Sequence, residues 1–153
     1  MMIERYWGRF FGEHTDSQEL VRYLDTLPEV CTLEEIFTQS GLKNLGGDLT
    51  AGSIDFTVGE NTFHAEYAFL WLLDVAVLLL ESKRVGRFNL ARIRGARSRM
   101  MRIDSSPKEF VQLTQAMKYF SLDPYEFSCA QLWDEDELDE LCNLCEEIRV
   151  QLD

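Results

Sequence analysis

Apolar side chains follow one another with few interruptions between residues 67 and 83. At 100° per residue they cover nearly the whole circumference of a helix, and only Asp74 and Glu81 interrupt them. Gly86 stands where such a helix would end. A helix that is apolar almost all round has to pack on several elements at once. The pattern therefore predicts a central, buried helix over about residues 67–83.

The end of the chain shows a narrower apolar stripe. Its members recur at spacings of three and four residues, which is typical of an amphipathic helix. They are Leu138, Leu141, Cys145, Ile148 and Leu152. Asp134 with Glu137 has the spacing of a capping box, so the predicted helix spans about residues 134–152. Carboxylates project from its other side, and these are Glu135, Asp136, Asp139, Glu140, Glu146 and Glu147.

Strand patterns lie between these helices. Ile54, Phe56 and Val58 alternate with polar residues, and the turn that follows predicts a hairpin into residues 62–65. Residues 88–93 and 98–103 also have strand character, whereas residues 3–11 fit either a strand or a short helix.

Further helices are expected before and after the strands. One begins at Thr15, Asp16 or Ser17 and is stopped by Pro28, and another runs from Pro107 through Phe120. A third opens at Thr32, which forms a capping pair with Glu35, and is closed by Gly41. Together these patterns predict an α+β fold, with a small antiparallel or mixed sheet covered by helices.

Composition and length limit the number of domains and the class of protein. The 153 residues fit one domain, 1–153, and 46% of them are hydrophobic, which is enough for a packed core. The longest apolar run, Tyr67–Leu80, is too short to cross a bilayer. Residues Met1–Gly12 lack the pattern of a signal peptide, and the four cysteines lack the spacing of a disulfide framework. The expected location is the cytoplasm.

Charge is distributed very unevenly along the chain. Residues 123–153 hold 11 acids and 1 base, which accounts for most of the net charge of −12. Residues 83–102, in contrast, hold eight of the 15 bases and no acid. The net charge argues against a general nucleic-acid binder and suits a basic partner. The sequence leaves open whether the acidic helix and the basic segment pair with each other within the fold.

Candidate chemistry is sparse. Cys142 and Cys145 have the spacing of zinc ligands, and Cys129 could add a third. Cys142 and Cys145 both fall on the apolar face of the last helix, however, and are interpreted as buried core thiols. His64 and Glu66 could form an acid–base pair, although no nucleophile motif accompanies them. We therefore expect no enzyme, no metal and no cofactor.

Asp74 is the unusual carboxylate of the sequence, because it falls within the predicted buried helix. A buried carboxylate must be paired, hydrogen-bonded or neutral. We expect an arginine of the segment 84–102 to pair with it.

The chain resembles, as a class, the immunity proteins of bacterial polymorphic toxins, including those of contact-dependent growth inhibition. The features that carry the resemblance are small size, the acidic run Asp134–Glu140, and the aromatic-rich segments Tyr6–Phe11 and Tyr119–Trp133. The resemblance implies a non-enzymatic protein that binds and neutralises a cognate toxin, commonly a basic nuclease.

The residues expected to contact that partner lie at the start of the acidic helix. Trp133 would be the aromatic anchor, and the carboxylates are Asp134, Glu135, Asp136, Asp139, Glu140 and Glu147. The alternative is a regulator that binds RNA or phosphate through the basic segment 83–102. A small enzyme using His64, Glu66 or Asp74 is a third hypothesis, which a cleft holding these side chains together would favour.

Overall fold

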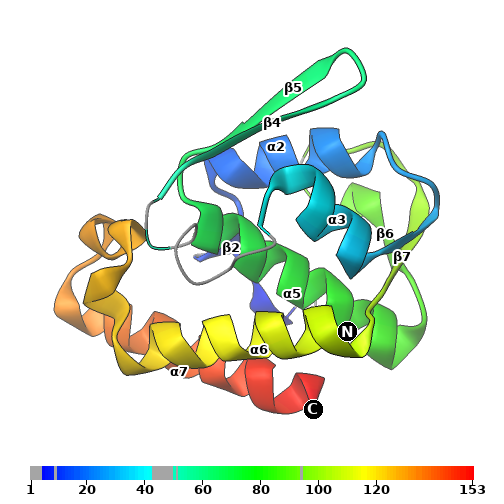
Figure 1. Ribbon diagram of the computed structural model, residues 1–153. Helices are drawn as coiled ribbons and strands as arrows, with labels where there is room; N and C mark the ends of the chain where they lie inside the picture. Colours follow the sequence, from blue (N-terminus) through cyan, green and yellow to red (C-terminus); the bar gives the residue numbers. More distant parts are fainter. Residues whose placement is uncertain (1–4, 9, 43–49, 51, 94) are drawn as a thin grey trace.

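A long helix, α5 (Ala68–Val85), runs through the middle of the protein (Figure 1). The computed structural model describes residues 5–8, 10–42, 50, 52–93 and 95–153. Every residue of α5 from Ala68 to Ser82 is buried, including Asp74 and Glu81. The helix ends at Gly86, whose positive φ of 97° closes the last turn. The predicted central helix is confirmed.

Four further helices surround α5 among the described residues. They are α2 (Thr15–Leu24), α3 (Leu33–Ser40), α6 (Pro107–Leu122) and α7 (Glu135–Leu152). Three short 3-10 helices connect elements, namely η1 (Leu90–Arg92), η2 (Pro124–Glu126) and η3 (Ser128–Leu132). The predicted caps of α3 and α7 are confirmed, since Thr32 Oγ1 accepts the Glu35 N–H at 3.1 Å and Asp134 with Glu137 forms a capping box.

The strands are short and divide into three small sheets. A mixed sheet has the order β3 (Val30–Thr32), β7 (Met100–Asp104), β6 (Phe88–Asn89), with β3 parallel and β6 antiparallel to β7. A hairpin joins β4 (Ile54–Val58) to β5 (Asn61–Ala65), and β1 (Trp7–Gly8) lies parallel to β2 (Phe11–Gly12). The predicted α+β class with a mixed sheet is confirmed. The strand expected over residues 88–93 keeps only its first two residues, because η1 follows directly.

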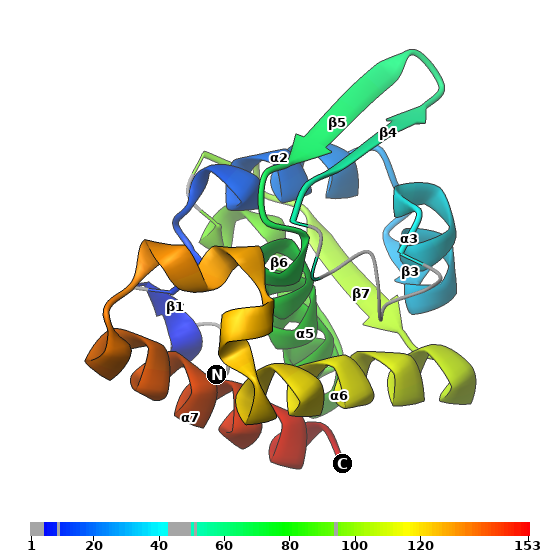
Figure 2. The same cartoon turned by 60° about the vertical axis from the view of Figure 1, so that its left-hand side comes forward.

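The hairpin β4–β5 projects from the body (Figures 1 and 2). Aromatic packing on α2 holds the middle pair of its ladder, Phe56 and Phe63. Phe56 and Phe63 lie 5.1 Å and 5.6 Å from the ring of Tyr23, measured between centroids. The hairpin is therefore fixed on α2.

Helices α6 and α7 pack side by side against α5, on the opposite side from α2 (Figures 1 and 2). Ser121 Oγ donates to the Cys142 carbonyl at 3.5 Å, and Cys145 Sγ to the Met117 carbonyl at 3.6 Å, so the two helices run antiparallel. Since η2 and η3 connect them, the last turn of α6 lies near the beginning of α7.

The expected partner of Asp74 was wrong. Its carboxylate accepts the Gly12 N–H at 2.9 Å and the Ser17 hydroxyl at 2.5 Å, and no arginine is involved in these bonds. The reason is distance along the helix. Arg84 lies ten residues further on, which is about 15 Å at 1.5 Å per residue. The arginines that follow bind other groups: Arg97 pairs with Asp25, Arg99 donates to carbonyls at the end of α2, and Arg102 pairs with Asp104.

Among the described residues, no helix combines the length and the apolar character needed to cross a membrane.

Candidate functional site

The beginning of α7 presents a carboxylate cluster to solvent. Asp134 Oδ1 accepts the Glu137 N–H at 2.8 Å, and the Glu137 side chain accepts the Asp134 N–H at 3.3 Å, which fixes the first turn. The apolar stripe, from Leu138 to Leu152, is buried as predicted. The opposite side of the helix must then face outward. We call its five exposed carboxylates the acidic surface: Asp134, Glu135, Asp136, Asp139 and Glu140.

The other two residues expected at the partner surface have contacts inside the fold. Glu147 forms an ion pair with Arg5, and its side chain is 34% exposed. Trp133 is half-buried, and its ring meets Phe10 edge-on at 5.6 Å between centroids. Both lie on the same side of the molecule as the acidic surface, and both also support the packing of the N-terminal segment.

Cations of the basic segment are engaged elsewhere in the fold. Arg97 pairs with Asp25 at 2.7 Å and Arg102 with Asp104 at 2.7 Å, while Arg99 donates to the carbonyls that follow α2. Lys83 and Arg84 do reach α7, but they donate to its last carbonyls, at 3.0 Å and 3.2 Å. Cations favour this negative end of a helix dipole. It lies about 18 Å from Glu140, the nearest residue of the acidic surface, at 1.5 Å per residue over 12 residues.

Exposed apolar side chains lie beside the acidic surface. Four of them stand in the last turn of α6 or in the connection from α6 to α7 and form what we call the apolar shoulder: Tyr119, Leu122, Tyr125 and Leu132. Leu122 is 74% exposed and Tyr125 69%, which is high for side chains of their size. A shallow hollow of about 500 Å³ opens between Tyr125 and Trp133. Large apolar side chains that are exposed near charged ones are typical of a protein interface.

Sequence reasoning named the aromatic-rich segment 119–133 but missed Leu122 and Leu132. The sequence of α6 does indicate that Leu122 is exposed, because the buried residues Leu113, Met117 and Phe120 define a single apolar face of the helix. Leu122 falls outside that face, so an apolar residue there has no partner within the helix pair.

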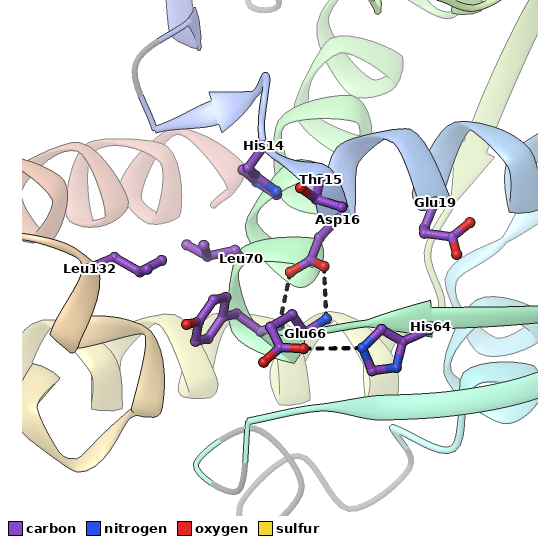
Figure 3. Close-up of a pocket in the computed structure, with 9 residues that line it drawn as sticks. His14, Thr15, Asp16, Glu19, His64, Glu66, Leu70 and Leu132 are labelled. Atoms are coloured by element: carbon purple, nitrogen blue, oxygen red, sulfur yellow. Dashed lines mark hydrogen bonds and ion pairs between the residues drawn. The ribbon is translucent and has the colours of Figure 1, made fainter.

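A second concave region lies between the start of α2, the end of β5 and η3 (Figure 3). It has a volume of about 440 Å³. We call it the histidine pocket, and its lining consists of His14, Thr15, Asp16, Glu19, His64, Glu66, Tyr67, Leu70 and Leu132. The predicted pair His64 and Glu66 is brought together here, whereas Asp74 is fully buried and does not line the pocket.

Asp16 shapes this pocket by capping α5 from outside that helix. Its two carboxylate oxygens accept the backbone N–H groups of Glu66 and Tyr67, at 2.7 Å and 2.8 Å (Figure 3). Tyr67, the N-cap residue of α5, provides no side-chain cap of its own. Asp16 therefore satisfies donors that the start of the buried helix would otherwise leave unpaired.

His14 connects the pocket to the buried carboxylate beneath it. Its Nδ1 accepts the Ser17 N–H at 3.2 Å and so caps α2, and its Nε2 lies 3.2 Å from Asp74 Oδ2. Burial disfavours the charged imidazole, but the contact with the Asp74 carboxylate outweighs it and raises the pKa of His14 above its usual value. Sequence reasoning missed His14, although it stands directly before the predicted start of α2.

His64 is held between two carboxylates on the hairpin. Its Nδ1 lies 2.7 Å from Asp55 and its Nε2 3.2 Å from Glu66. Hydrogen bonds to both carboxylates raise the pKa of His64. Both nitrogens of His64 and Nδ1 of His14 are therefore hydrogen-bonded, and Nε2 of His14 is buried against the Asp74 carboxylate.

The cysteines are core residues, as predicted, with Cys142 half-buried. Burial raises the pKa of the Cys129 thiol to about 12 and also raises the pKa of Cys145. In the parts of the chain that the structure describes, no three His, Cys, Asp or Glu side chains are grouped so that they could hold a metal ion.

Comparison with known protein families gives a match over nearly the whole chain. Residues 2–152 match the model of the family described as Immunity protein 68. No curated protein and no solved structure matches the chain. The matched range includes both the acidic surface and the histidine pocket.

Proposed function

Because the chain belongs to the Immunity protein 68 family, we propose that it neutralises its toxin by docking the acidic surface on a basic face of that toxin, such as the substrate cleft of a nuclease. Membership of the family itself implies a toxin as the partner. The chemistry of the partner and the surface that meets it are our proposal, as are its place in the bacterial cytoplasm and in contact-dependent growth inhibition.

The observation that carries the proposal is the exposure of the five carboxylates on two successive turns of α7. A nuclease cleft is cationic because it holds phosphates, and a carboxylate cluster can take the place of that backbone. Opposite charges of this kind steer association and raise its rate.

Part of the cluster has a structural explanation, and part does not. Asp134, Glu135 and Asp136 stand at the positive end of the α7 dipole, where each carboxylate is favourable by about 0.3–1 kcal/mol. Asp139 and Glu140 lie beyond the first turn, where that benefit has faded and neighbouring like charges repel. The helix dipole therefore does not account for the whole cluster, and Asp139 in particular favours a binding role.

The apolar shoulder supplies what carboxylates alone do not. Charges determine orientation and rate, whereas desolvated aromatic and aliphatic anchors provide most of the binding free energy of an interface. Tyr125 is exposed and lines the same hollow as Trp133, which directly precedes Asp134, so a partner covering the acidic surface and this hollow would bury Tyr125 as well.

A binding protein also agrees better with the structure than the two other hypotheses. In the histidine pocket, both nitrogens of His64 and Nδ1 of His14 are hydrogen-bonded, and Nε2 of His14 is buried against the Asp74 carboxylate. Five of the eight bases of the segment 83–102 form hydrogen bonds or ion pairs at α2, β7 or the end of α7. These contacts make the five bases less available for binding RNA phosphates.

The proposal is tested with the toxin encoded beside the gene of this protein. The triple variant Asp136→Asn, Asp139→Asn, Glu140→Gln is co-expressed with that toxin, and growth and co-purification are measured. We expect loss of protection. The matched control is Glu29→Gln, Glu34→Gln, Glu60→Gln, which changes the net charge equally at exposed residues elsewhere. Equal protection by both variants would refute the role of the acidic surface.

A further inference from the structure

We infer that the histidine pocket receives an arginine side chain of the toxin. This inference rests on the proposed function and adds to it a second, more specific contact. The argument uses the charge of the lining, its apolar wall and its position next to the acidic surface.

The lining is acidic and contains no lysine or arginine. Three of its nine residues are carboxylates, Asp16, Glu19 and Glu66. Glu19 pairs with Arg22 on the next turn of α2, so the charge of Glu19 is partly balanced. Asp16 uses its oxygens on two backbone N–H groups, which leaves its negative charge in place.

Glu66 remains in excess whatever the state of the imidazole beside it. Asp55 and Glu66 share the single ring of His64, so one negative charge is left over even when His64 is protonated. The Glu66 side chain is 63% exposed, and in Figure 3 its carboxylate lies at the pocket with the dashed contact to His64 on one side. The pocket therefore favours a cation and disfavours an anion.

The wall opposite these charges is apolar. Tyr67, Leu70 and Leu132 form it, with Leu70 buried and Leu132 46% exposed. An arginine can lay its methylene stem on leucine side chains and stack its guanidinium on an aromatic ring. Its planar group is also more weakly hydrated than an ammonium and can donate two parallel hydrogen bonds to one carboxylate. This combination selects arginine over lysine.

The pocket and the acidic surface are close enough for one partner to occupy both. Leu132 belongs to the pocket and to the apolar shoulder, and only Trp133 separates it from Asp134. Gln131 Nε2 donates to the Tyr67 hydroxyl at 3.4 Å and so ties η3 to the pocket wall. Figure 2 shows η3 running above the first turns of α7.

A direct test needs no toxin. The ¹⁵N-labelled protein is titrated with N-acetyl-arginine amide and, as the uncharged isostere, N-acetyl-citrulline amide, and amide chemical shifts are recorded. We expect saturable shifts at Glu66, Tyr67 and Leu70 with the arginine compound only. No shifts at these amides, or equal shifts with both compounds, would overturn the inference and leave the proposed function untouched.

The same pocket is then tested in the complex. Glu66→Gln removes the excess charge, and Leu132→Lys places a tethered ammonium at the pocket that competes with the incoming side chain. We expect each variant to weaken toxin binding by about tenfold. Glu34→Gln, on α3, is the control for the first variant, and Leu132→Gln for the second. If both pocket variants bind as the wild type while the acidic-surface variant is weakened, the pocket has no part in the interface.

Discussion

His14 Nε2 lies 3.2 Å from Asp74 Oδ2, and this contact joins the start of α2 to the centre of the buried helix α5. The same carboxylate accepts the Gly12 N–H and the Ser17 hydroxyl. A carboxylate without exposed surface thus accepts two hydrogen bonds and lies in ion-pair contact with His14, all from the segment that precedes and opens α2. We call these contacts of Asp74 with Gly12, His14 and Ser17 the anchor. The anchor fixes the positions of His14 and Asp16, and with them one wall of the histidine pocket.

The anchor predicts a large loss of stability when Asp74 is changed. Asp74→Ala leaves the donors of Gly12 and Ser17 buried without an acceptor, and we expect the free energy of unfolding to fall by about 3 kcal/mol. Ser17→Ala removes one donor and should cost about 1 kcal/mol. Urea unfolding followed by circular dichroism measures both. Asp139→Asn is the exposed control, and an equal effect of Asp74→Ala and Asp139→Asn would contradict the account.

The raised pKa of His14 gives stability a dependence on pH. Because the folded-state pKa lies above the unfolded value, the stabilising charge on His14 is fully present below about pH 6.5 and is lost as pH rises through the folded pKa. Ser17 N–H keeps the His14 carbonyl as an acceptor, at 3.0 Å, when Nδ1 is protonated.

The measurement is the difference in unfolding free energy between the wild type and His14→Gln. We expect this difference to be larger at pH 5.5 than at pH 8, with about 0.5–1.5 kcal/mol between the two. The same comparison with His64→Gln controls for the second histidine, whose exposure lets solvent screen the effect. A His14→Gln difference that grows with pH would show that the interpretation of the anchor is wrong.

Two features require a glycine at position 12, namely its backbone conformation and the closeness of the Trp7 side chain. Its φ is +80°, and a Cβ there would lie 1.8 Å from the indole of Trp7. We expect Gly12→Ala to lower the free energy of unfolding by about 2–4 kcal/mol, from left-handed strain and overpacking together. Gly59→Ala has a similar positive φ with nothing within 4 Å, so it isolates the strain and should cost about 1–2 kcal/mol. If chemical unfolding shows that Gly12→Ala and Gly59→Ala lower the free energy of unfolding equally, the contact with Trp7 does not contribute.

The apolar shoulder predicts a change in affinity without a change in stability. Tyr125→Ala and Leu122→Ser each remove an exposed side chain, and we expect toxin binding to weaken by about 1–2 kcal/mol per substitution. The melting temperature should stay within about 2 °C of the wild type. Val111→Ser, at an exposed position nearer the start of α6, is the matched control. If calorimetric titration gives the same toxin affinity for all three variants, the apolar shoulder is not part of the interface.

The elements that could be predicted from the sequence are those with a local signal. The apolar circumference of residues 68–82, the stripe on α7 and the caps at Thr32 and Asp134 each follow from neighbouring residues. The strand β6 could not be delimited, because two residues carry no period and η1 interrupts what looked like a longer strand.

The partners of buried polar groups could not be predicted for a different reason. The donors to Asp74 are a backbone N–H and a serine hydroxyl about sixty residues earlier, and no charge pattern marks them. A pairing with arginine was the natural inference from charge alone, and it was wrong because Asp74 accepts hydrogen bonds from Gly12 and Ser17, whereas Arg97, Arg99 and Arg102 bind other acceptors. The histidine pocket is likewise assembled from three segments that lie far apart in the sequence, residues 14–19, residues 64–70 and Leu132.

The central claim is that the carboxylates at the start of α7 meet a basic face of the toxin. The most direct measurement is the dissociation constant of the complex at low and at high salt, for the wild type and for Asp136→Asn, Asp139→Asn, Glu140→Gln. The account predicts wild-type affinity that falls steeply with salt, and a variant that binds at least about tenfold more weakly at low salt with a shallower dependence. Equal affinities and equal salt dependence of the two proteins would contradict it.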